Sequence, residues 1–120
     1  MERKLSTIFA LDVVGFSKLM AIDEDITLAV LKQRREIIDA IIMEHSGRMF
    51  GSAGDSVIAE FDSPVKATEA SIKIQDKMQT INDALPDNQK MQFRIGLNLG
   101  DVMISGDNLY GDAINVAARL

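Results

Sequence analysis

The sequence predicts an α+β domain with a ferredoxin-like β-α-β-β-α-β core, in which both core helices lie on one face of an antiparallel sheet. Three observations lead to this prediction. A nearly continuous apolar strand lies near the start of the chain, two long segments carry apolar residues at helical spacing, and strand-like alternation lies between and after them. The 120 residues, 47% of them hydrophobic, are expected to form one domain with a single core.

Charge and composition exclude several classes of function. The formal net charge of −5 argues against a nucleic-acid surface, because binding a phosphate backbone needs clustered Lys and Arg. A small nucleotide stays possible, since a metal and a few backbone N–H groups can neutralise its phosphates. The chain has no cysteine, which excludes disulfides and thiol nucleophiles. No stretch approaches the ~20 apolar residues of a membrane span, and we expect a cytoplasmic domain.

The first predicted strand lies within residues 7–17, a run of apolar residues that carries Asp12 near its end. Such a run is typical of a central strand that is buried on both faces. A buried carboxylate without a partner is costly, so Asp12 is expected to need a cation. The following Gly15-Phe16-Ser17 predicts a turn in which Ser17 or a neighbour caps a short helical turn. This turn is either a phosphate cradle or a plain strand-to-helix connection.

A long amphipathic helix is predicted from Asp23 or Asp25 to about Ser46, with Gly47 just past its end. The basic run over residues 32–35 is interpreted as the solvated face of this helix. The only histidine, His45, falls in the last turn. There an imidazolium favours the negative end of the helix dipole, an interpretation we prefer to catalysis.

A β-hairpin is predicted over residues 49–61, with a tight turn at Ala53-Gly54 and Asp55 at its tip. If this hairpin lies beside the first strand, Asp12 and Asp55 end close together. Two adjacent carboxylates suit a hard divalent ion, Mg²⁺ or Mn²⁺ rather than Zn²⁺. Taken alone, Asp55 would more simply be interpreted as a solvated turn residue.

The rest of the chain supplies the second core helix and the last strands. Ser63-Pro64 predicts a helix start, and the apolar stripe of this helix is Val65, Ala67, Ala70, Ile74, Met78, Ile81 and Leu85. A strand is predicted over residues 91–99, and a second strand over 101–105 is expected to turn back at Gly100. Residues 106–111 are expected to be a loop, and residues 112–120 to begin a helix.

Four segments of the sequence carry a resemblance to a known family: residues 9–17, 53–61, 93–100 and 110–120. Together and in this order they resemble the class III nucleotide cyclase catalytic domain, which makes cyclic AMP or cyclic GMP. The resemblance covers essentially the whole chain. It implies a homodimer with the active site at the subunit interface and ATP or GTP as substrate.

The resemblance also implies roles for particular residues. Asp12 and Asp55, with the carbonyl of Val13, would hold two Mg²⁺ or Mn²⁺ ions. The triphosphate would be held by the N–H groups around three residues, Gly15, Phe16 and Ser17. From the partner subunit, Asn115 would orient the ribose and Arg119 would stabilise charge on the α-phosphate. Without the other motifs, Asn115 and Arg119 would be read as a helix cap and a solvated arginine.

Three departures from the family pattern stand out. Gly51 occupies the position of a Lys that usually reads adenine, and Asn108 replaces its companion Asp, so the choice of base is open. Asp101 stands where many members carry a phosphate-contacting Arg. The chain also ends at Leu120, before a downstream phosphate-binding Lys of many members, so the domain over residues 1–120 is expected to be incomplete at its C-terminus.

The function expected from the resemblance is a cyclase that forms 3′,5′-cyclic AMP, or else cyclic GMP, and pyrophosphate in intracellular signal transduction. The departures at Gly51, Asp101 and Asn108 leave open an inactive cyclase-like module that dimerises and senses nucleotide. A different two-metal enzyme on a similar fold, such as a dinucleotide cyclase, would leave the helix with Asn115 and Arg119 unexplained.

Overall fold

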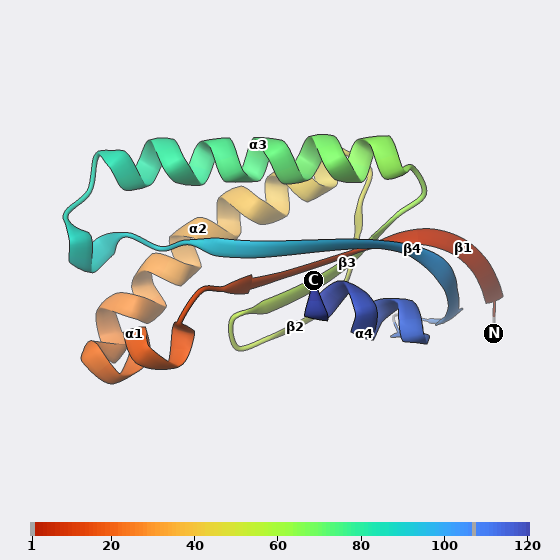
Figure 1. Ribbon diagram of the computed structural model, residues 1–120, viewed down its shortest axis with the longest axis horizontal. Helices are drawn as coiled ribbons and strands as arrows, with labels where there is room; N and C mark the ends of the chain where they lie inside the picture. Colours follow the sequence, from red (N-terminus) through yellow and green to blue (C-terminus); the bar gives the residue numbers. More distant parts are fainter. Residues whose placement is uncertain (1, 107) are drawn as a thin grey trace.

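A five-stranded antiparallel sheet runs through the molecule, with its strands in the order β2-β3-β1-β4-β5. The computed structural model describes residues 2–106 and 108–120. The elements in chain order are β1 (Glu2–Val13), α1 (Phe16–Ile22), α2 (Glu24–Glu44), β2 (Arg48–Ala53), β3 (Ser56–Phe61), α3 (Pro64–Asp83), the 3-10 turn η1 (Asp87–Gln89), β4 (Phe93–Ser105), β5 (Asn108–Tyr110) and α4 (Asp112–Arg119). Helices α2 and α3 cover one face and α4 lies on the other (Figure 1). The predicted α+β fold with both core helices on one face is confirmed.

Strand β1 is the centre of the sheet and is buried from both sides, as predicted. It pairs with β4 from Glu2 opposite Ile104 to Val13 opposite Phe93, and with β3 on its other edge. Alternate side chains of β1 enter two separate cores. The core beneath α2 and α3 takes Phe9, Leu11 and Val13, and the smaller core beneath α4 takes Ile8 and Ala10.

The predicted helix starts are confirmed by their caps. The side chain of Asp23 accepts the N–H of Ile26 at 3.0 Å and begins α2. The hydroxyl of Ser63 accepts the N–H of Lys66 at 3.2 Å and begins α3. Val65, predicted to lie on the apolar stripe of α3, is exposed instead. No helix among the described residues is long and apolar enough to cross a membrane.

The predicted turn at Gly100 is wrong, because β4 continues through it without a break. The glycine is needed for a different reason. A Cβ at Gly100 would lie 2.7 Å from the Cβ of Ala113, so the residue lets α4 approach the sheet closely. The expected loop over residues 106–111 is also corrected, since β5 pairs with the end of β4 there. Asp107 lies outside the described residues.

Two smaller expectations also fail. Helix α1 is preceded by Gly15 in the left-handed region, with φ 65°, and no side chain caps it, so Ser17 is not a cap. Arg34, expected on a solvated face, is only 2% exposed. Its guanidinium donates to the carbonyls of Met91 and Gln89 and so joins α2 to the segment before β4. Burial lowers the pKa of Arg34.

Candidate active site

Asp55 lies at the end of β1 because of the tight turn between β2 and β3. Ala53 and Ser56 are paired, which leaves a two-residue connection in which Gly54 has a φ of 57°. The Oδ2 atom of Asp55 accepts the backbone N–H of Val13 at 3.1 Å. Val13 directly follows Asp12, so the structure brings Asp55 beside Asp12, as the sequence led us to expect.

Asp12 already has a cationic partner, which is Arg94. The two residues are opposite each other in the β1–β4 ladder. Nε and one terminal nitrogen of Arg94 donate to the two carboxylate oxygens of Asp12 at 2.9 and 3.0 Å. The Asp12 carboxylate raises the pKa of Arg94, and Asp55 adds a smaller shift in the same direction. Sequence patterns do not reveal this pair, because it depends on the register of two strands that lie far apart in the chain.

The donor atoms at this site fit a magnesium or manganese ion. Asp12 and Asp55 supply carboxylate oxygens. Because the N–H and C=O of an extended residue point to the same side of a strand, the carbonyl of Val13 faces the β2–β3 turn as well. Among the described residues no group of three or more His, Cys, Asp or Glu could hold a metal ion. A pair of carboxylates that leaves other positions to water and phosphate suits Mg²⁺ better than a closed zinc site.

The expected triphosphate-binding residues begin two positions after Val13. Gly15 adopts a left-handed conformation, and a Cβ there would meet no atom within 4 Å. The aromatic ring of Phe16 packs against the core beneath α2 and α3, and Ser17 is exposed. The first N–H groups of a helix have no acceptor within the helix, so those at the start of α1 are available to a ligand.

A cleft of about 290 Å³ lies between the sheet and α4. Asp12, Arg94 and Arg119 all line it, together with Gly96. A Cβ at Gly96 would collide with the carbonyl oxygen of Ala117, so the glycine allows α4 to approach the sheet this closely. Arg119 therefore shares a cleft with the carboxylate of its own subunit. Asn115 is exposed on α4 and is not among the residues that line the cleft.

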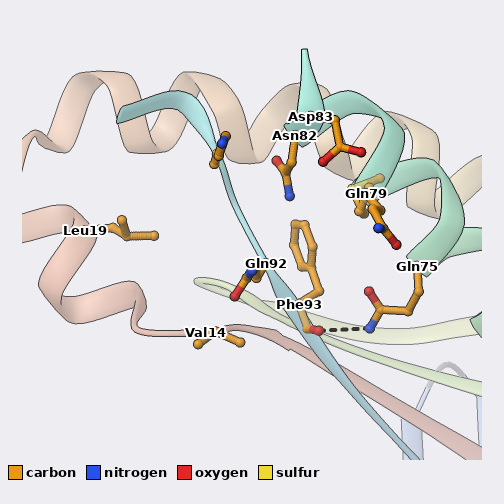
Figure 2. Close-up of a pocket in the computed structure, with 10 residues that line it drawn as sticks. Val14, Leu19, Gln75, Gln79, Asn82, Asp83, Gln92 and Phe93 are labelled. Carbon is orange, nitrogen blue, oxygen red and sulfur yellow. Dashed lines mark hydrogen bonds between the residues drawn. The ribbon is translucent and has the colours of Figure 1, made fainter. Parts of the chain in front are cut away.

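A larger cavity, of about 620 Å³, lies on the opposite face between α1, α3 and the start of β4. Figure 2 shows the side chains that line it, including Gln75, whose amide donates to the carbonyl of Phe93 at 2.9 Å. Most of its polar groups are amides, and Asp83 is its only carboxylate. This cavity lacks the carboxylate pair, so we assign the candidate active site to the smaller cleft and the adjoining end of β1.

Comparison with solved structures places the fold among cyclase catalytic domains. An adenylate/guanylate cyclase/hydrolase from Silicibacter pomeroyi superposes with a TM-score of 0.86 at 37% identity, covering 99% of this chain and 69% of that one. A bacterial light-regulated adenylyl cyclase superposes with a TM-score of 0.85 at 27% identity, covering 99% of this chain and 40% of that one.

The sequence comparisons agree with the fold. The family model described as the adenylate and guanylate cyclase catalytic domain matches residues 2–120. The chain belongs to this family. It is 41% identical over 120 residues to "Putative adenylate cyclase 3" of Rhizobium meliloti (strain 1021), a match that covers 99% of this chain. The chain spans only 20% of the length of that relative.

Proposed function

We propose that this chain is the catalytic domain of a nucleotide cyclase that converts ATP, or else GTP, to the 3′,5′-cyclic nucleotide and pyrophosphate. The observation that carries the proposal is the Asp55 carboxylate, bonded to the N–H of Val13 beside Asp12. Membership of the cyclase family and the likeness to proteins named as adenylate cyclases support the same reaction.

In this proposal Asp12, Asp55 and the carbonyl of Val13 hold two Mg²⁺ or Mn²⁺ ions. When bound, such ions lower the pKa of the ribose 3′-hydroxyl and neutralise the charge of the leaving pyrophosphate. The N–H groups at the start of α1, from Gly15 to Ser17, bind the triphosphate. Arg119 offers a guanidinium to the charge that develops on the α-phosphate, and Asn115 orients the ribose.

We further propose that, in a homodimer, Asn115 and Arg119 act on the nucleotide held at the carboxylate pair of a partner subunit. Both residues are exposed on α4, one helical turn apart. Apolar side chains beside them, those of Val116 and Leu120, are also exposed and would be covered by a partner. The position of Arg119 in the cleft of its own subunit favours a second arrangement, in which it acts within one chain.

Mixing two inactive variants distinguishes these arrangements. A mixed dimer contains one Asp55→Ala subunit and one Arg119→Ala subunit. If the active sites lie at the interface, one of the two sites would combine an intact Asp55 with an intact Arg119. Activity should therefore return on mixing if Arg119 acts on the partner. If Arg119 acts within its own chain, every site contains one defect and the mixture stays inactive.

The direct test of the proposed function is mass spectrometry of products formed from ATP and from GTP, each with Mg²⁺ and with Mn²⁺. Because Gly51 and Asn108 replace the usual base-reading pair, the base preference must be determined from which cyclic nucleotide is formed. Asp55→Ala should abolish metal-dependent turnover, whereas Asp76→Ala, which removes an exposed carboxylate on α3, should not. Tight nucleotide binding with no product would instead favour a nucleotide-sensing module.

A further inference from the structure

The ion pair between Arg94 and Asp12 occupies a carboxylate that the proposed reaction needs. Both oxygens of Asp12 accept hydrogen bonds from Arg94. A divalent ion bound by this carboxylate would share its two oxygens with the guanidinium, and the two positive charges would lie close enough to repel each other. A divalent cation at Asp12 would therefore weaken the hold of Arg94 on this carboxylate.

The exposure of the pair allows that exchange. The side chain of Arg94 is 67% exposed and that of Asp12 is 31% exposed. An ion pair this open to water contributes little to stability, so separating it costs little. The long arginine side chain also extends from β4 into the cleft that contains Asp12, so it can move without leaving the site.

The charge balance indicates where the guanidinium goes next. Two carboxylates, Asp12 and Asp55, and two guanidiniums, Arg94 and Arg119, contribute charge to the proposed site; Asp12, Arg94 and Arg119 line the same cleft. Two divalent cations and a fully ionised nucleoside triphosphate also balance each other, so the loaded site is neutral only while both arginines stay. A guanidinium presents donors in a planar fork that matches phosphate oxygens.

We propose that Arg94 is a substrate-binding residue that exchanges partners: it pairs with Asp12 in the metal-free site and binds the triphosphate once a divalent cation has taken that carboxylate. This inference rests on the proposed function. Arg94 would then bind the phosphates in a chain that carries Asp101 at the position where many family members carry a phosphate-contacting arginine. Asp101 lies opposite Leu5, at the other end of the β1–β4 ladder from Asp12.

The test compares Arg94→Gln with Arg94→Lys and with Arg3→Gln. The last variant removes the same charge from the far end of the sheet, where Arg3 lies opposite Met103. Binding of Mn²⁺ alone is followed by the electron paramagnetic resonance signal of the free ion. Binding of α,β-methylene-ATP, which cannot be cyclised, is followed by calorimetry at saturating Mn²⁺.

Arg94→Gln should have opposite effects on the two ligands. Loss of the competing guanidinium should tighten Mn²⁺ binding by about three-fold, as expected for an exposed ion pair. Loss of a charged phosphate contact should weaken nucleotide binding by about ten-fold. Arg94→Lys should retain part of the nucleotide affinity, and Arg3→Gln should change neither value.

Other outcomes would overturn the exchange. If Arg94→Gln weakened Mn²⁺ binding as well, Arg94 would only hold Asp12 in place. If the wild-type protein bound and cyclised nucleotide, and Arg94→Gln bound nucleotide with the same affinity, Arg94 would pair with Asp12 in the metal-free site but would not bind substrate. A wild-type protein that neither binds nor cyclises nucleotide would refute the proposed function itself, whatever Arg94→Gln did to Mn²⁺.

Discussion

Two ion-paired carboxylates, those of Glu60 and Asp12, lie on the α4 side of the sheet, one toward each end of β1. They differ in their exposure to solvent and in their partners. Glu60 lies opposite Ile8, whose side chain enters the core beneath α4. Its carboxylate is 1% exposed, accepts the hydroxyl of Ser6 at 2.7 Å and lies 2.8 Å from Nζ of Lys4. Asp12, at the other end, is half-buried and has the exposed Arg94 as its partner.

The difference shows how burial separates a structural charge from an exchangeable one. The Glu60 carboxylate is buried, and losing Lys4 would leave its desolvated charge without a cation. The Asp12 carboxylate and Arg94 form an exposed ion pair, which can separate at small cost. We therefore expect substitutions at the Glu60 end to lower stability and substitutions at the Asp12 end to lower activity.

The largest expected effect is on turnover in Asp12→Asn. The amide keeps the size of the side chain but removes the charge that would bind a divalent cation, so the cyclase rate should fall by about a thousand-fold or more. Stability should change by less than about 1 kcal/mol, because the lost ion pair is exposed. Initial rates and urea denaturation of the same preparation check both values. A large loss of stability would place Asp12 in the structural class with Glu60.

The reverse pattern is expected for Lys4→Met. Met keeps the length of the side chain but leaves Glu60 buried without its cation, which should cost about 3 kcal/mol of unfolding free energy. The rate per folded molecule should stay close to wild type. Lys66→Met, on the exposed first turn of α3, provides the matched control. A change below about 0.5 kcal/mol would mean that Glu60 does not depend on Lys4.

A smaller effect is expected from Gly96→Ala, which tests how far the Asp12 end depends on α4. The new methyl group would collide with the carbonyl of Ala117 and displace the helix, at a cost of about 1–3 kcal/mol. Because Arg119 is carried by α4, turnover should fall while the Lys4–Glu60 contact persists. Denaturation and rate measurements check this, and a fully active, stable variant would show that α4 adapts without consequence.

The smallest effect concerns Asp62, the exposed second carboxylate partner of Lys4. The hydrogen bond from Lys4, at 2.6 Å, lowers the pKa of Asp62. A lowered folded-state pKa adds stability that is present above the ordinary pKa of Asp62 and is lost as the pH falls through the lowered one. In Lys4→Met the pKa of Asp62 should rise toward its ordinary value, measured by NMR titration of the side-chain carboxyl. An unchanged pKa would show that this contact is absent in solution.

Much of this arrangement followed from local sequence signals. The alternation of residues 49–61 and the Ala53-Gly54 turn predicted the hairpin, and the order of elements predicted its place beside β1. Capping residues predicted where α2 and α3 begin. These signals act within a few residues of each other, so one sequence suffices to read them.

The missed features depend on contacts between distant segments. Gly100 looks like a turn residue until α4 is placed over it, since only the close approach of Ala113 explains the glycine. Arg34 lies within a basic run, yet its acceptors come from α3 and from the segment that precedes β4. The pairing of Asp12 with Arg94 requires the register between the first strand and the fourth. Periodicity along the chain carries none of this information.

The same long-range register has a consequence during protein synthesis. Asp12 and Arg94 are 82 positions apart, and at ~5–20 residues per second a ribosome needs roughly 4 to 16 s to make the intervening chain. Strand β3 can cover one edge of β1 early, but the other edge has no native partner until β4 emerges. During that interval the apolar nascent strand is open to pairing with a neighbouring chain or to capture by a chaperone.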